Sequence, residues 1–129
     1  MMYNLVKFLQ LPVANQERQM DEWLSTILSA SEEEQQKGIR NLILATAQLK
    51  LDDQRKVVRA RTEAMVRLSL EQAKSIIRSR YRAMQEYQAE NDMDRRLVME
   101  AVQKMPPEAQ KKVAQIVAEI RDEVAARTA

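Results

Sequence analysis

Turn-forming residues are nearly missing from this chain, and their scarcity restricts the fold more than any other feature. One glycine and three prolines occur in 129 residues. Tight hairpin turns depend on glycine and a few similar residues, so the chain lacks the material for a multi-stranded sheet. Its commonest residues, among them Ala, Leu, Glu, Gln and Arg, are strong helix formers. The sequence therefore predicts an all-α fold: a single domain, residues 1–129, forming a compact bundle of five to seven helices.

Local start signals divide the chain into these helices. Ser31 and Ser69 each precede a Glu or Gln by three residues, which is the pattern of a capping box. Asp52 offers a further N-cap, and Pro107 suits a first helical position. The apolar stripe that ends before Pro107 and the one that comes after it predict a C-terminal helical hairpin over residues 92–127.

Absent residue types exclude much catalytic chemistry. The chain has no His and no Cys, which rules out a haem His ligand, an HExxH zinc site, a Ser-His-Asp triad and disulfides. One glycine cannot build a phosphate-binding loop. Glu90–Asp94 offers oxygen ligands but lacks the Gly and the distal Glu of a calcium loop, so Asp92 or Asp94 is predicted to be a helix N-cap. We therefore expect no enzyme activity, no cofactor, no bound metal and no small-molecule substrate.

The apolar residues give no indication of a membrane protein. No run approaches the roughly 20 apolar residues that a membrane span requires. The first sixteen residues contain one Lys and a short, interrupted apolar stretch without a small-residue cleavage site, so no signal peptide is predicted. A cytoplasmic location is the expectation that remains.

An arginine-rich octet occurs twice. Val58–Met65 reads VRARTEAM, and Ile77–Met84, nineteen residues later, reads IRSRYRAM. A further shift of nineteen towards the N-terminus aligns weaker similarities, so residues 32–88 are interpreted as three related units of nineteen residues. In one continuous helix this shift would rotate equivalent side chains by about 100°. Helix breaks near Asp52 and Ser69 would let each unit present the same face; convergent helix patterning is the alternative explanation.

Two of the repeated arginines occupy apolar helix faces. Arg61 and Arg80 fall within the apolar stripes of their units, at the position that Leu42 holds in the first unit. A buried guanidinium is costly unless it is paired or hydrated. Either the side chains extend past the stripe to water, or they meet a carboxylate such as Glu63 or Glu90, or they line an interface for an acidic partner or a phosphate.

Charge is segregated along the chain. Residues 55–96 hold 11 Lys/Arg and 6 Asp/Glu, a net charge of +5, whereas residues 1–54 carry −3. Within the basic segment, Lys74, Arg78 and Arg82 recur every four residues and form a stripe on one helix. Such a segment suits an acidic protein surface, nucleic acid, or head-to-tail self-association with the acidic N-terminal part of another copy. A solvated face of mixed charge is the alternative.

The pentapeptide LSLEQ, Leu68–Gln72, is similar to the LTxxQ motif of the periplasmic Spy/CpxP-type chaperones, which are small all-α proteins with basic cradles. The match covers five residues, and LDDQ, Leu51–Gln54, is one residue too short to be a second copy. The resemblance implies a small chaperone-like protein.

These observations lead to one principal functional hypothesis. The chain is predicted to be a non-enzymatic interaction or assembly module that binds a protein partner or itself, most simply as a homo-oligomer. Nucleic-acid binding by residues 55–96 is the alternative, and a chaperone-like role is the weaker one. The predicted contact residues are Arg59, Arg61, Lys74, Arg78, Arg80 and Arg82.

Overall fold

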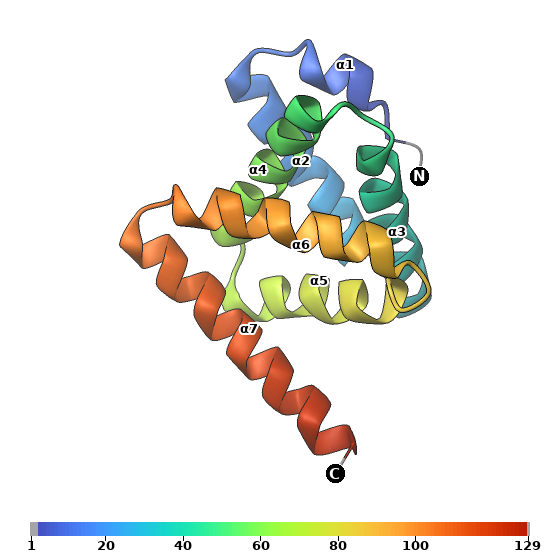
Figure 1. Cartoon of the computed structure of the whole chain (residues 1–129), viewed down its shortest axis with the longest axis vertical. Helices are drawn as coiled ribbons and strands as arrows, with labels where there is room; N and C mark the ends of the chain where they lie inside the picture. The colour runs from blue at the N-terminus through green and yellow to red at the C-terminus, as the bar shows by residue number, and fades with distance from the viewer. Residues whose placement is uncertain (1–2, 129) are drawn as a thin grey trace.

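The computed structural model of the chain describes residues 3–128 (Figure 1). It contains seven helices in that range and no strand, which confirms the predicted all-α bundle; residues 1, 2 and 129 of the predicted domain lie outside the described residues. In chain order the helices are α1 (Leu5–Leu9), α2 (Val13–Leu28), α3 (Glu32–Ala47), α4 (Leu51–Arg67), α5 (Leu70–Ala83), α6 (Gln88–Gln103) and α7 (Pro107–Thr128).

The helices begin at a nearly constant interval. The first residues of α2, α3, α4 and α5 succeed one another at nineteen-residue steps; α6 begins eighteen residues after α5, and α7 nineteen residues after α6. The predicted breaks near Asp52 and Ser69 are present, because α3, α4 and α5 are separate helices. A spacing of eighteen or nineteen residues thus extends beyond the predicted residues 32–88, from α2 to α7.

A glutamine at the fourth position of four helices joins each of them to the end of the helix before it. Gln16, Gln35, Gln54 and Gln110 each donate from the side-chain amide to the carbonyl five residues earlier, over 2.8–3.2 Å. All but Gln16 also donate to the carbonyl seven residues earlier, which belongs to the last residue of the preceding helix. The glutamines therefore satisfy carbonyls that a helix end leaves without an intrahelical partner.

The Ser69 and Pro107 signals behave as predicted, whereas Ser31 forms only one of the two hydrogen bonds of its predicted capping box. The Ser69 hydroxyl accepts from the backbone of Gln72, whose side chain accepts from the Ser69 backbone, which completes a capping box. Ser31 accepts from the backbone N–H of Glu34 at 3.3 Å, and Pro107 is the first residue of α7.

The predicted aspartate N-caps are wrong. Lys50 is the N-cap of α4, so Asp52 lies within the first turn, where a carboxylate still interacts favourably with the positive end of the helix dipole. Helix α6 begins at Gln88 after Tyr87, and Asp92 and Asp94 both lie inside it. Asp94 does not cap the helix because its carboxylate is engaged by arginines of two other helices.

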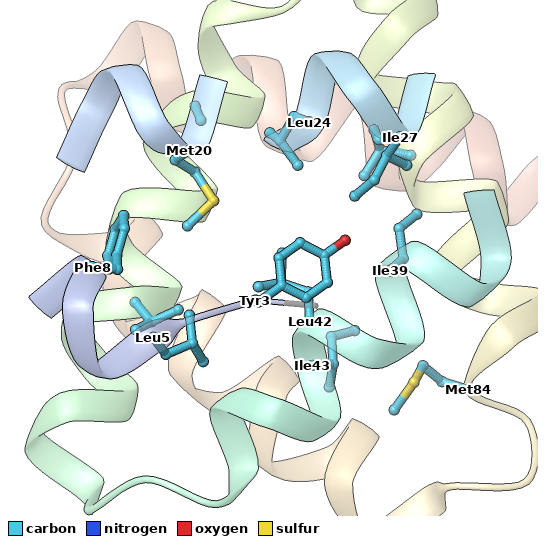
Figure 2. Close-up of a cluster of buried hydrophobic side chains, with 13 residues drawn as sticks. Tyr3, Leu5, Phe8, Met20, Leu24, Ile27, Ile39, Leu42, Ile43 and Met84 are labelled. Carbon is cyan, nitrogen blue, oxygen red and sulfur yellow. The ribbon is translucent and has the colours of Figure 1, made fainter. Parts of the chain in front are cut away.

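The central core gathers side chains from α1 to α5 around three aromatic rings. Tyr3 meets Trp23 edge-on at 5.1 Å between ring centroids, and Phe8 stacks on Trp23 at 5.4 Å. Figure 2 shows Tyr3 among Leu24 of α2 and Leu42 of α3. The buried Tyr3 hydroxyl donates to the carbonyl of Gly38 at 2.8 Å, and burial raises the pKa of Tyr3 to about 12.

Gly38 permits the close approach of α2 and α3. A Cβ atom at this position would lie 3.0 Å from Ile27 Cγ1 and 3.4 Å from the Tyr3 hydroxyl oxygen. The only glycine of the chain is therefore used inside a helix, where a side chain would push on the core, and its φ is not positive.

The helices pack chiefly against neighbours two positions away along the chain: α2 on α4, α3 on α5, α4 on α6 and α5 on α7. A second apolar cluster, which includes Met65 of α4, Ala73 of α5 and Ile116 of α7, packs α7 against these two helices. Lys112 fixes the start of α7 by donating to the carbonyl of Val66 at 2.7 Å and to that of Leu68. In the view of Figure 1 the C-terminal end of α7 extends past the rest of the bundle. No helix within residues 3–128 is long and apolar enough to cross a membrane.

Candidate functional site

Arg61 and Arg80, the repeated arginines of the octets, meet at one buried carboxylate. Arg61 of α4 donates to both oxygens of Asp94 at 2.8 and 2.7 Å, and Arg80 of α5 donates to Oδ2 at 3.2 and 2.9 Å. The side chain of Asp94 is 3% exposed, and those of Arg61 and Arg80 are 12% and 18% exposed. The arginines are thus paired, as one of the three interpretations predicts, but with Asp94 in place of Glu63 or Glu90. We call these three residues the buried triad.

The buried triad carries one more positive charge than negative. Burial lowers the pKa of Arg80; the carboxylate of Asp94 opposes this shift, and the charge of Arg61 adds to it. Nη1 of Arg61 is buried without a hydrogen-bond partner among the described residues. The buried triad connects three helices, and its charged groups face the interior. This arrangement favours a structural role for Arg61 and Arg80.

The predicted stripe on α5 is paired as well. Lys74 Nζ lies 3.2 Å from Glu119 and 3.6 Å from Glu123, and Arg78 donates to Glu123 at 2.7 and 3.2 Å. These hydrogen bonds raise the pKa of Lys74 and of Arg78, and that from Arg78 lowers the pKa of Glu123. Arg82, the third residue of the stripe, forms an ion pair with Glu32 of α3. The stripe therefore binds α5 to α7 and α3.

Most of the basic segment is neutralised in this way. Eight of the eleven Lys/Arg residues in 55–96 have a carboxylate within ion-pair distance in the described structure. Several partners come from the acidic N-terminal helices and from α7, as in the pair of Arg67 with Asp21 at 2.7 Å. Charge that is separated along the sequence is brought together by folding.

A groove opens where α3, α5 and α7 meet, beside the stripe. It has a volume of about 530 Å³ and is lined by Glu32, Gln35, Ser75, Arg78, Ser79, Arg82, Glu123 and Arg127. We call it the α5 groove. Its wall is ordered by Gln35, whose side-chain oxygen accepts from the hydroxyls of Ser75 and Ser79 at 3.2 and 3.1 Å.

A second, smaller groove lies between α4 and α6. Its volume is about 100 Å³, and its lining residues are Arg55, Lys56, Arg59, Leu97, Glu100, Ala101 and Lys104. We call it the α4–α6 groove. Four cations and one carboxylate surround it, and Leu97 and Ala101 form its apolar floor.

The cations of the α4–α6 groove are only partly paired. Arg55 donates to Glu100 at 3.0 Å, and Arg59 lies 3.8 Å from Glu63. Neither Lys56 nor Lys104 has an ion pair with another residue of the described chain. Of the predicted contact residues, only Arg59 lies here. Arg55 and Lys56 belong to the basic segment 55–96 but were not among the predicted contact residues. Lys104 was not predicted because the packing of α6 brings it to α4, and no local pattern encodes that contact.

The pentapeptide Leu68–Gln72 has a local explanation, since Ser69 and Gln72 form the capping box of α5. Residues 3–128 contain no group of three or more Asp or Glu residues arranged to hold a metal ion. Comparison with protein-family models, with curated proteins and with solved structures found no match.

Proposed function

We propose that this protein is a non-enzymatic helical interaction module that binds an acidic segment of a partner protein over the α4–α6 groove. The observation that carries the proposal is the lining of this groove by four cations and one carboxylate. The arginines of the buried triad are paired in the interior, so the proposed contact surface centres on Lys56 and Lys104, which have no ion pair within the described residues. The exposed Arg55 and Arg59 lie beside them in the same groove.

The shape of the α4–α6 groove favours a protein contact over a small substrate. Its volume of about 100 Å³ is below the roughly 300–1,000 Å³ of typical small-molecule sites. Lys56 and Lys104 are exposed at its rim, so pairing them with carboxylates requires little desolvation. Rim charges of this kind chiefly accelerate association and select the partner, and the apolar floor offers contact area to a side chain of the partner.

A second copy of the chain is one source of the acidic segment. Glu17 and Glu22 of α2 and Glu33 of α3 are exposed, and none has an ion pair within residues 3–128. Exposed carboxylates of α2 or α3 meeting the α4–α6 groove of another copy would form a head-to-tail contact, which produces rings or filaments. Homo-oligomerisation therefore remains part of the proposal, as does the expected cytoplasmic location.

Nucleic-acid binding is the second candidate, and the four cations of the α4–α6 groove favour it. Neutralisation of eight of the eleven basic residues in 55–96 within the described chain limits the number of phosphates that the segment can contact. For duplex DNA, the logarithm of the binding constant falls by about 0.9 per unit of log salt concentration for each phosphate contacted. Four contacts would therefore give a slope near −4. The chaperone-like alternative rests on the Leu68–Gln72 resemblance alone.

Fluorescence anisotropy with a labelled oligoglutamate peptide and with a labelled DNA oligonucleotide tests the proposal. We expect the double variant Lys56→Glu/Lys104→Glu to lose at least about tenfold in affinity for the peptide, or about 1.4 kcal/mol. The matched control Arg18→Glu/Arg121→Glu changes the net charge equally, at exposed positions on α2 and α7.

The control should bind the peptide within about twofold of the parent protein. Equal losses in both variants would mean that net charge alone attracts the peptide, and the assignment to the α4–α6 groove would then be wrong. Preferential binding of DNA, lost only in the groove variant, would replace the principal proposal with the second candidate. Sedimentation velocity of the same variants separates self-association from binding of a different protein.

A further inference from the structure

Three guanidinium groups converge on the α5 groove from two helices. Arg78 and Arg82 are one turn apart on α5, and Arg127 comes from the last turn of α7. Arg127 is exposed and has no ion pair within the part of the chain that the structure describes. The α5 groove shares no lining residue with the α4–α6 groove, so a ligand bound here is independent of the proposed function.

The two arginines of α5 keep unused hydrogen-bond donors. Arg78 uses Nε and Nη2 towards Glu123, which leaves Nη1, and Arg82 pairs with Glu32 through Nη1, which leaves Nε and Nη2. Arg127 adds a whole guanidinium. A guanidinium presents five N–H donors in a planar fork, so these groups can surround an anion from several directions.

The two carboxylates in the groove do not close it to an anion. Glu123 has a second partner, Lys74, at 3.6 Å, so it remains paired when Arg78 turns towards a ligand. Glu32 is exposed, and its ion pair with Arg82 lies at the surface, where such pairs contribute little. Exchange of a surface carboxylate for a ligand oxyanion is therefore inexpensive.

The base of the groove is polar and lies between α3 and α5. Ser75 and Ser79 donate to the Gln35 side-chain oxygen, and the Gln35 amide nitrogen donates to the Ala30 carbonyl at 3.2 Å. Ser79 is 3% exposed, which places this network at the base of the groove. The ordered network holds α3 against α5 and fixes the position of the arginine-bearing turns.

We infer that the α5 groove binds a phosphate-class anion, either inorganic phosphate or the phosphate monoester of a phosphorylated ligand. A tetrahedral dianion presents more acceptor oxygens than a planar carboxylate and so can satisfy donors that approach from both helices. The volume of about 530 Å³ leaves room for the group that carries the phosphate. By bridging α5 and α7, the bound anion would stabilise the C-terminal half of α7.

Thermal melting in increasing inorganic phosphate, against sodium chloride at equal ionic strength, tests this inference. We expect a saturable rise in the melting temperature with phosphate, since a ligand of the folded state stabilises it by mass action. The rise should be lost in Arg82→Ala/Arg127→Ala and kept in Arg18→Ala/Arg121→Ala. Arg127→Ala alone, which removes no ion pair of the described chain, should weaken phosphate binding without lowering the melting temperature in chloride.

A phosphoserine peptide distinguishes the two sources of the anion. Binding at least about tenfold tighter than inorganic phosphate would assign the groove to a phosphorylated protein, and comparable binding would assign it to free phosphate. A melting temperature that responds to phosphate no more than to chloride would overturn the inference, as would a rise that survives the Arg82→Ala/Arg127→Ala substitutions.

Discussion

Asp94 is a buried carboxylate that two arginines share. One carboxylate, 3% exposed, accepts hydrogen bonds from Arg61 and Arg80 on two other helices. Removing one of the arginines should cost less stability than removing Asp94. Removal of either arginine leaves a neutral pair, whereas removal of the carboxylate leaves two like charges close together in the interior.

This asymmetry predicts a mild effect for Arg61→Leu. The substitution removes the buried Nη1 that lacks a partner, extends the apolar stripe of α4 and leaves Asp94 paired with Arg80. We expect the free energy of unfolding to change by less than about 1.5 kcal/mol, measured by urea denaturation. A loss of several kcal/mol would show that Arg61 contributes more than charge pairing to the contact between α4 and α6.

At the scale of the helices, the repeated glutamine should contribute measurably to stability. Gln54 donates to the carbonyls of Leu49 at 2.8 Å and of Ala47 at 3.4 Å, and so caps the end of α3 from within α4. Its substitution by Ala should lower the free energy of unfolding by about 1 kcal/mol, because partly buried acceptors lose their donor. Gln115→Ala, at an exposed position of α7, is the matched control and should change stability by less than about 0.5 kcal/mol. Equal effects would refute the capping role.

The contact between α5 and α7 should weaken in acid. Hydrogen bonding by Arg78 holds the pKa of Glu123 below its ordinary value. A carboxylate with a depressed pKa in the folded state adds stability above its unfolded pKa of about 4.3, and this contribution is lost as the pH falls through the folded pKa. We predict that Glu123→Gln makes stability depend less on pH below about 4.5, measured by thermal melts. Glu108→Gln, at an exposed position in the first turn of α7, should retain the parent dependence.

The parts of this fold that the sequence predicted depend on local signals. Ser69 and Gln72 are three residues apart, and Pro107 acts at its own position, so both could be recognised without tertiary information. Gln16, Gln35 and Gln54 recur every nineteen residues, and this spacing is a sequence signal from which the capping glutamines could have been predicted.

The parts that could not be predicted depend on packing. Asp94 looks like a helix N-cap in the sequence, yet it pairs with Arg61 thirty-three residues away, a distance that only the packing of α4 against α6 closes. Lys104 reaches the α4–α6 groove by the same packing. Local patterning sets helix ends and apolar faces, whereas the partners of charged groups depend on the register between helices.

At the scale of the whole molecule, folding pairs charges that are segregated along the sequence. Acidic residues of α2, α3 and α7 pair with the basic α4 and α5, and the buried triad joins α4, α5 and α6. The helices are held together by contacts between segments that are distant in the sequence. Figure 1 shows these helices crossing one another. Of the cations in the α4–α6 groove, Lys56 and Lys104 have no ion pair within the described residues.

Urea denaturation of Asp94→Asn, beside Asp92→Asn as the control, tests most directly whether the repeated arginines hold this fold together. Asp92 is exposed on the same helix and has no ion pair within residues 3–128. We predict that Asp94→Asn lowers the free energy of unfolding by about 3–5 kcal/mol, because two buried guanidiniums lose their shared carboxylate. Asp92→Asn should change it by less than about 0.5 kcal/mol. Equal stability of the two variants would contradict a structural role for the buried triad. It would favour instead the interpretation that Arg61 and Arg80 contact a partner.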